Sequence, residues 1–221
     1  MDNSKQKCQQ ETMRKFVVLL NGELTITERL KNQIAGGHVV GVDGGMRHAE
    51  KLGVQPEFWI GDFDSSSKEL QEKWADVQRL VHPVEKDQTD GDLALEFVLS
   101  GGAQEIVLVG GVGGQADHTV CHITQLIRLR QQNLTCFATS GIQEVWPLVA
   151  GSLQWDFPIG ATVSLVGFSA LKNLSLSGVK WPLTGRNVEF GSSLTMSNEV
   201  TDKVSGSLEQ GFGVVFVKDI G

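Results

Sequence analysis

Continuous apolar runs alternate with helix-like segments through the first 140 residues, and this alternation restricts the possible folds more than any other feature. A strand buried on both faces of a parallel sheet reads as an unbroken hydrophobic run, and the helix between two such strands covers one face of the sheet. Helical spacing follows the first run at Ile26, Leu30 and Ile34. We therefore predict a Rossmann-like α/β unit, a parallel sheet with helices on both faces. Its strands are expected within 16–22, 38–45, 58–65, 105–111 and 134–140.

The pattern changes after about residue 141. The segments that follow, such as ATVSLVGF (161–168) and FGVVFVKD (212–219), are short, separated by glycine and rich in Val, Leu, Phe, Ser and Thr. This pattern is typical of an all-β unit, a sandwich or a partial barrel. We expect the boundary near 141–152. The predicted parts are a disordered lead-in at 1–14, an α/β unit at 15–140 and a β unit at 150–221.

Charge and cysteine content exclude several classes of protein. The chain has 19 Lys and Arg against 26 Asp and Glu, a net charge of −7, and no basic cluster, so we predict no nucleic-acid partner. Apolar runs are far too short to span a membrane, which predicts no membrane partner. The three cysteines are scattered and odd in number, as expected for reduced thiols in the cytoplasm.

Acidic residues follow several of the predicted strands. In WIGDFDSS (59–66), Asp62 and Asp64 come directly after an apolar run, and Asp43 follows the run before it. Two carboxylates about 4 Å apart repel by roughly 4 kcal/mol near a protein surface, so something must compensate. Because ligands bind outside the carboxyl ends of parallel strands, these acids are expected to meet at one edge of the sheet. The segments EKDQTDGD and GGVGGQADH add Lys86, Asp87, Thr89, Asp90, Asp117 and His118 to the same edge.

A set of carboxylates without a cysteine cluster favours a hard cation, Mg²⁺ before Ca²⁺. Magnesium in proteins is commonly held by one or two carboxylates together with substrate phosphates. The glycines at 110–114, with Gly113 and Gly114 nearest the helix that follows, present backbone N–H groups suited to phosphate oxygens. Together these features predict a nucleotide phosphotransferase.

Simpler interpretations remain open from the residues alone. Asp62 and Asp64 are suited to capping a helix at 66–72, and Asp90 to capping the next helix. The glycines at 110–114 match no established phosphate-binding pattern and are compatible with an ordinary turn. His118 and His122 are four residues apart, a spacing that zinc sites use, but no glutamate of an HExxH motif lies between them.

The ordered motifs DGG (43–45), GDFDS (61–65), KDQTD (86–90) and GGVGGQADH (110–118) resemble the signature set of the thiamin pyrophosphokinase family. In the C-terminal part, GVKWPLTG (178–185) and FGSSL (190–194) resemble the thiamin-binding part of that family. The resemblance spans about residues 16–218. It implies a homodimer in which each chain has an α/β catalytic part and a C-terminal β-sandwich, with the active site between subunits.

The resemblance also implies a reaction and roles for residues. Members of the family transfer the diphosphoryl group of ATP to the hydroxyl of thiamin with Mg²⁺, giving thiamin diphosphate and AMP. Asp62, Asp64 and Asp90 would hold Mg²⁺ and the triphosphate, and one of them would accept the hydroxyl proton. Trp181 would stack, from the partner subunit, on the thiamin pyrimidine; read alone, a tryptophan in this position is more often a core or sheet-edge residue. The remaining implied substrate contacts are Asp43, Lys86, Asp87, Thr89, Gly113, Gly114, Asp117, His118, Ser193, Ser197 and Asn198.

The sequence departs from the family pattern at Gln115, where the family has arginine. Arginine supplies a fixed cation for phosphate and glutamine does not. Either Lys86 or another basic residue then takes its place, or ATP binds more weakly. Two competing functions follow from the same residues: another Mg²⁺-dependent phosphohydrolase or nucleotidyltransferase, and a catalytically weak protein that binds thiamin or nucleotide.

Overall fold

The computed structural model describes residues 13–63, 66–81 and 88–219. Most of the predicted lead-in at 1–14 therefore lies outside the described residues. The first strand begins at Lys15, one residue before the expected apolar run. Along the described chain, no helix is long and apolar enough to cross a membrane.

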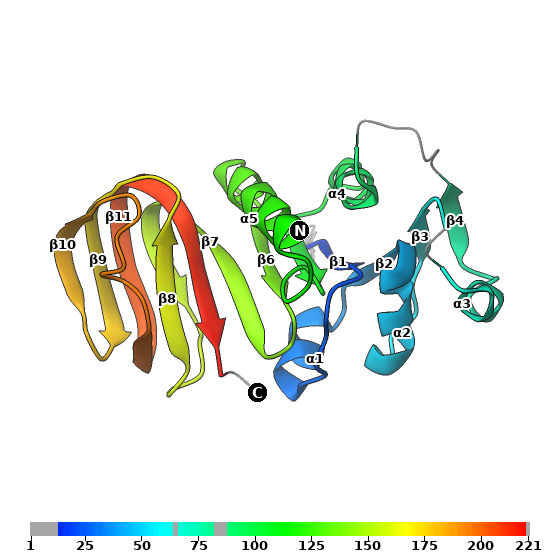
Figure 1. The fold of residues 1–221 in the computed structure, drawn as a ribbon, viewed down its shortest axis with the longest axis horizontal. Coiled ribbons are helices and arrows are strands. Elements are labelled where there is room, and N and C mark those ends of the chain that lie inside the picture. Colours follow the sequence, from blue (N-terminus) through cyan, green and yellow to red (C-terminus); the bar gives the residue numbers. More distant parts are fainter. Residues whose placement is uncertain (1–12, 64–65, 82–87, 220–221) are drawn as a thin grey trace, which may run out of the picture.

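The N-terminal part is a parallel sheet with the strand order β4-β3-β2-β1-β5-β6 (Figure 1). The chain moves outward from β1 to β4 and then returns to the other side of β1 to form β5. The order therefore reverses between β1 and β5, and a ligand site is expected outside the strand ends there. The elements are β1 (Lys15–Leu19), α1 (Glu28–Ile34), β2 (His38–Val42), the 3₁₀ helix η1 (Asp43–Met46), α2 (Arg47–Leu52), β3 (Phe58–Gly61), α3 (Lys68–Lys73), β4 (Gln78–Val81), α4 (Asp90–Ser100), β5 (Glu105–Val109), α5 (Ala116–Gln131) and β6 (Thr135–Thr139).

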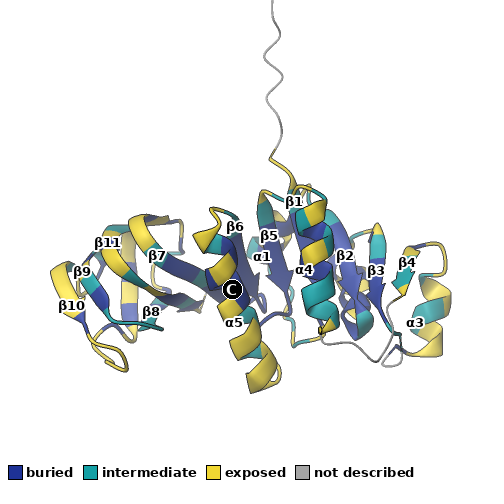
Figure 2. Cartoon of the chain, turned by 90° about the horizontal axis from the view of Figure 1, so that it is seen from above, coloured by how far each residue is buried: buried dark blue, intermediate teal, exposed yellow. Residues whose placement is uncertain are grey.

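Alternate residues of the central strands face opposite cores. In β1, Phe16 and Val18 pack into a cluster shared with α4 and α5, whereas Val17 and Leu19 pack into a cluster shared with α1 and α2. Figure 2 shows these strands buried and the outer surfaces of α4 and α5 exposed. Side chains of a strand alternate between the two faces of its sheet, so an unbroken apolar run is what two covered faces require. The predicted α/β fold is confirmed.

The C-terminal part contains strands and no helix among the described residues. Both ends of β11 pair with β8, and its middle pairs with β9, so one long strand serves two layers around a single apolar core. Gly211 has φ +116 at the irregular point where β11 bends, and a side chain there would overlap the carbonyl of Ala170. The strand-rich C-terminal region is as predicted. Its strands are β7 (Gln143–Trp155), β8 (Thr162–Gly167), β9 (Leu171–Val179), β10 (Leu183–Val188) and β11 (Asn198–Lys218).

The two parts share one sheet. Strand β7 pairs antiparallel with β6 through Ala138–Val145 and Thr139–Glu144, and it pairs with β11 along most of its length. The interval 141–152, where the sequence pattern changes, is therefore mostly strand. The residue limits of two separate units at 15–140 and 150–221 stay a prediction.

A buried carboxylate ties α1 to β7. The side chain of Glu144 is fully buried, and it accepts hydrogen bonds from Arg29 Nε at 2.6 Å, Gln33 Nε2 at 2.7 Å and Trp146 Nε1 at 2.8 Å. Arg29 also donates to the carbonyl of Asp156 at 3.1 Å. The Trp146 ring stacks on Phe137 of β6 with 4.2 Å between centroids. A buried charge needs such a set of partners, so this network fixes how the strand-rich part joins the α/β part.

Replacing Arg29 with alanine should lower the free energy of unfolding by about 3 kcal/mol, because it leaves the buried carboxylate of Glu144 without its countercharge. Urea denaturation followed by tryptophan fluorescence measures this. Lys31→Ala is the matched control on the same helix, since its partner Glu28 is exposed and such pairs contribute less than about 1 kcal/mol. Equal effects of the two substitutions would contradict a role for Glu144 in joining the two parts.

Candidate active site

A cleft of about 590 Å³ opens at the carboxyl ends of β1, β2 and β5, where the strand order reverses. Its floor is formed by backbone at Leu20–Gly22 and Gly110–Gly111. These two turns approach each other closely, and a side chain on Gly22 would overlap the carbonyl of Gly110. The cleft is thus located where an open parallel sheet binds its ligands.

Three carboxylates line this cleft at close range. Asp43 follows β2, Asp62 follows β3, and Asp90 is the first residue of α4. One oxygen from each of the three lies within 4.8 Å of the others, and all three side chains are partly buried. Among the described residues this is the cluster with ligand geometry for a metal ion, and it contains no histidine. Oxygen ligands at this spacing fit a hard divalent cation, whereas the zinc interpretation of His118 and His122 has no such support.

Local backbone geometry brings Asp43 and Asp62 together. Asp43 has φ +40, and its carbonyl accepts a hydrogen bond from the indole of Trp59 at 3.0 Å. Gly61 has φ +151, and a side chain there would overlap the Asp43 carboxylate, so only glycine lets β3 pass so close. The N–H of Phe63 then donates to Asp43 Oδ1 at 3.4 Å.

Helix capping does not explain these acids. The N-cap of α3 is Ser67, whose hydroxyl accepts from the N–H of Leu70, so the capping interpretation of Asp62 is wrong. The N-cap of α4 is Thr89, which forms a capping box with Asp92, so that interpretation of Asp90 is also wrong. Both helices are capped by neighbouring residues, and Asp62 and Asp90 face the cleft instead.

The cluster changes the proton affinity of Asp43. Burial, a hydrogen bond with Asp90 and the charges of Asp90 and Asp62 together raise the pKa of Asp43 from 3.8 to about 7. A bound proton reduces the repulsion between the three groups, as a divalent cation would do more completely. In the apo protein the cluster therefore holds a proton at the pH where most aspartates are ionised.

Of the other predicted site residues, some line the cleft, some lie beside it and some are outside the described residues. Asp64, Lys86 and Asp87 lie outside the described residues. Thr89, Gly114 and His118 line the cleft. Gly113 and Asp117 are exposed in the same loop and helix but do not line the cleft; Asp117 accepts from the N–H of His118 at 2.9 Å. The glycine loop thus reaches the cleft through Gly110, Gly111 and Gly114.

Further residues that line the cleft were not predicted as site residues, among them Asn21, Glu23, Arg47 and His122. Asn21 and Glu23 follow β1, and the rule used for the other strand ends would have found them. His122 donates from Nδ1 to the carbonyl of Gly111 at 2.8 Å, and burial lowers its pKa, which keeps its ring neutral. Arg47 is the one Lys or Arg among the described lining residues, and it donates to the carbonyls of Asn21 and Gly22 at 2.9 and 3.2 Å.

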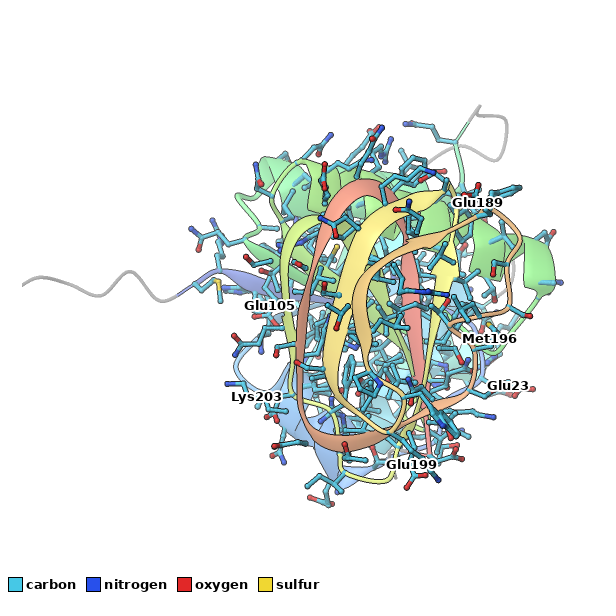
Figure 3. All side chains as sticks on the ribbon, turned by 90° about the vertical axis from the view of Figure 1, so that its left-hand side faces the viewer. Glu23, Glu105, Glu189, Met196, Glu199 and Lys203 are labelled. Carbon is cyan, nitrogen blue, oxygen red and sulfur yellow. The ribbon has the colours of Figure 1, made fainter. Side chains whose placement is uncertain are left out.

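The predicted thiamin contacts lie far from the cleft of their own chain. Trp181 stands between β9 and β10, which form one end of the molecule, whereas β1 and β2 lie beyond β7 in the parallel part of the sheet (Figure 1). Its side chain is 58% exposed, so the core interpretation is wrong. Its backbone is held at both ends by buried Asn198, which accepts from its N–H at 3.0 Å and donates to its carbonyl at 2.8 Å. Ser193 and Ser197 are exposed on the next loop, between β10 and β11, which runs from Glu189 past Met196 along one side of Figure 3.

Two parts of the chain match known protein domains. Residues 35–138 match the thiamin pyrophosphokinase catalytic domain, and residues 153–211 match the thiamin pyrophosphokinase vitamin B1 binding domain. A thiamine pyrophosphokinase of Bacillus subtilis is 30% identical over 165 residues, 73% of this chain and 77% of that protein. The chain belongs to the thiamin pyrophosphokinase family.

Other relatives of the family cover the chain to a similar extent. Thiamin pyrophosphokinase 1 of Caenorhabditis elegans is 29% identical over 199 residues, 83% of this chain and 81% of that protein. The crystal structure of the thiamine pyrophosphokinase from Bacillus subtilis superimposes with a TM-score of 0.83 at 25% identity, covering 93% of this chain and 99% of that one. Asp43, Asp62 and Asp90 lie within the residues that match the catalytic domain, and Trp181 lies within those that match the vitamin B1 binding domain.

The raised pKa of Asp43 predicts how metal binding depends on pH. A cation must displace the proton on Asp43, so affinity for Mg²⁺ or Mn²⁺ should rise between pH 6 and pH 8. Isothermal titration with each metal at both pH values measures this rise. In Asp43→Asn, which has no proton to lose, the remaining affinity should depend much less on pH over this range.

The same shift has a consequence for the stability of the metal-free protein. Because the folded state binds a proton that the unfolded chain releases near 3.8, the free energy of unfolding falls as the pH rises from about 4 to about 7. Asp43→Asn should therefore raise the melting temperature more at pH 8 than at pH 5. An equal change at both pH values would show that Asp43 is ionised throughout.

Proposed function

We propose that this chain transfers the diphosphoryl group of ATP to the hydroxyl of thiamin, giving thiamin diphosphate and AMP, as members of its family do. The observation that carries the proposal is the cluster of Asp43, Asp62 and Asp90 in a cleft at the switch point of the sheet, inside the region that matches the family's catalytic domain. The new bond joins the thiamin oxygen to the β-phosphorus, and the bond from that phosphorus to the AMP oxygen breaks.

The three carboxylates are the proposed holders of Mg²⁺, and Asp64 is proposed to join them on the basis of the sequence motif. The donor set fits the ion, since it consists of oxygen atoms close enough to share one cation. Bound magnesium would neutralise charge on the phosphates. The carboxylates themselves would fix the position of the triphosphate, and one of them would accept the proton from the thiamin hydroxyl.

The phosphates are proposed to lie between the glycine loop and Arg47. Gly110, Gly111 and Gly114 line the cleft, and Arg47, the first residue of α2, lines it beside the turn after β1. Gln115 also lines the cleft, as an exposed N-cap residue of α5, and carries no charge. Arg47 therefore takes the role of fixed cation that the sequence pattern leaves open at Gln115, with Lys86 as a proposed second contact from the sequence motif.

Thiamin is proposed to bind across a homodimer. Trp181 is exposed, has its backbone held by Asn198 and lies between β9 and β10, across β7 from the strands that carry the cleft, so it is suited to completing the cleft of a partner subunit. Lys180 lies 5.2 Å from its ring centroid, on the face of the indole. Ser193, Ser197 and Asn198 are the proposed neighbours of the pyrimidine. The proposed location is the cytoplasm, supported by free thiols at Cys121 and Cys136.

The reaction distinguishes this proposal from the competing functions. With ATP, Mg²⁺ and thiamin, the protein should form AMP and thiamin diphosphate in equal amounts, and without thiamin it should release little AMP. Asp62→Asn should lower kcat by about 10²–10³, the usual cost of removing one preorganised charged group. ADP with thiamin monophosphate would contradict diphosphoryl transfer, and nucleotide release independent of thiamin would indicate a hydrolase.

The two ends of the proposed site should respond to different substrates. Trp181→Ala should raise the KM for thiamin by about 5- to 150-fold, because stacking on an aromatic ring contributes roughly 1–3 kcal/mol, and should leave the KM for ATP nearly unchanged. Arg47→Ala should raise the KM for ATP and not that for thiamin. Lys51→Ala, which removes the same charge from the exposed side of α2, is the control for Arg47.

Mixing two impaired variants, at a thiamin concentration below the KM of Trp181→Ala, tests whether the site is shared. A heterodimer of Trp181→Ala and Asp62→Asn chains has one site with both residues intact, so a mixture should recover part of the wild-type activity. Subunit exchange is verified by native mass spectrometry. Exchange without recovery would place both residues in a site of the same chain.

A further inference from the structure

A side chain from α3 spans the turn that carries Asp62. Gln71 Nε2 donates to the carbonyl of Phe63 at 3.3 Å and to the carbonyl of Ser66 at 3.0 Å. These are the described residues on either side of 64–65. The amide therefore fixes the distance across the acidic turn from outside the cleft.

Arg79 of β4 holds Gln71 in place. Its guanidinium donates to the backbone carbonyl of Gln71 at 2.8 Å and to Gln71 Oε1 at 3.4 Å. The same guanidinium lies over the rings of Trp59 and Phe63, at 5.2 and 5.3 Å from their centroids. A planar, multidentate cation suits this position, where it must stack and donate at once. Because Arg79 donates to the amide oxygen of Gln71, the amide nitrogen points the other way and donates to the turn.

The turn itself needs support from outside. Phe63 has φ +66, a backbone conformation that residues with side chains rarely adopt. Its ring packs edge-on against Trp59, whose indole donates to the carbonyl of Asp43. Helix α3 has six residues, of which none is fully buried and Leu70 packs partly buried against the core, so the polar contacts of Gln71 and Arg79 add to a small apolar contact in holding the turn. Gln71 thus holds the backbone of Phe63, the residue after Asp62. Arg79 packs on Trp59, which in turn holds the backbone of Asp43.

We infer that Gln71 and Arg79 are positioning residues of the metal site, holding the Asp62 turn so that its carboxylate meets those of Asp43 and Asp90. This inference rests on the proposed function of the acidic cluster as a metal site. Neither side chain is among the described residues that line the cleft, so both are proposed to act on the site through the Asp62 turn. Residues that orient metal ligands from behind typically change metal affinity or activity by 10- to 100-fold when replaced.

Direct metal binding tests the inference without relying on turnover. Mn²⁺ alone is titrated into the full-length protein and the free ion is measured by electron paramagnetic resonance. Gln71→Ala should raise the Mn²⁺ Kd by about 10-fold. Gln71→Glu should do at least as much, because it places a carboxylate against two carbonyl oxygens. Gln78→Ala is the matched control, a glutamine exposed on β4 next to Arg79, and should leave the Kd unchanged.

Steady-state kinetics of Gln71→Ala, and Mn²⁺ binding by an Arg79 variant, distinguish a positioning role from a general loss of stability. In Gln71→Ala, kcat should fall and more Mg²⁺ should be needed for half-maximal rate, while the KM for thiamin stays near the wild-type value. Arg79→Lys keeps a cation but loses the planar stack on Trp59 and Phe63. It should raise the Mn²⁺ Kd by about 3-fold or more. If Gln71→Ala does not fold, the Kd of Arg79→Lys tests the inference instead. A lower melting temperature with a Kd within two-fold of wild type, in either variant, would overturn the inference.

The reference variant Asp62→Asn separates failure of this inference from failure of the proposed function. If the wild-type protein binds Mn²⁺ and Asp62→Asn does not, the metal site stands, and only the Gln71 and Arg79 variants decide the inference. If the wild-type protein and Asp62→Asn bind Mn²⁺ equally or not at all, the acidic cluster is not the metal site, and the inference falls with it.

Discussion

Repulsion between three carboxylates is the constraint on which the rest of the site depends. Asp43, Asp62 and Asp90 come from three separate segments, and their oxygens lie within 4.8 Å of one another. At such distances each pair of charges costs roughly 4 kcal/mol near a protein surface, so the apo fold must oppose it. It does so partly through the proton on Asp43 and partly through backbone that is fixed by Gly61 and Trp59. The strained geometry is compatible with a site that becomes favourable once a cation and phosphates arrive.

A second buried charge, on Glu144, fixes the orientation of the strand-rich part relative to the α/β part. Glu144 lies in the strand that continues the parallel sheet into the strand-rich part, and Arg29 reaches it from the helix after β1. The turn that leads into that helix also lines the cleft. The orientation of the strand-rich end, and with it Trp181, is therefore set by a helix whose preceding turn lines the cleft.

Much of this could be predicted from the sequence, for physical reasons that also show where prediction stopped. Buried parallel strands have no polar face, so their runs and the acids at their ends were visible, including Asp43, Asp62 and Asp90. The sequence did not distinguish the actual helix caps, Ser67 and Thr89, from the neighbouring acids, because several side chains with an oxygen acceptor precede each helix. Arg47, Gln71 and Arg79 act through contacts with residues distant in sequence, and no local pattern indicates such contacts.

The pairing of β7 with β6 determines how the chain can be divided. A cut at residues 141–142, where the composition begins to change, would remove β7 from the edge of β6 and leave the backbone of Ala138 and Thr139 without its partner strand. Such an open edge invites pairing with other chains and aggregation. An isolated catalytic fragment of this protein would have to retain β7 as a covering strand, even though the side chains of that strand belong in part to the other core.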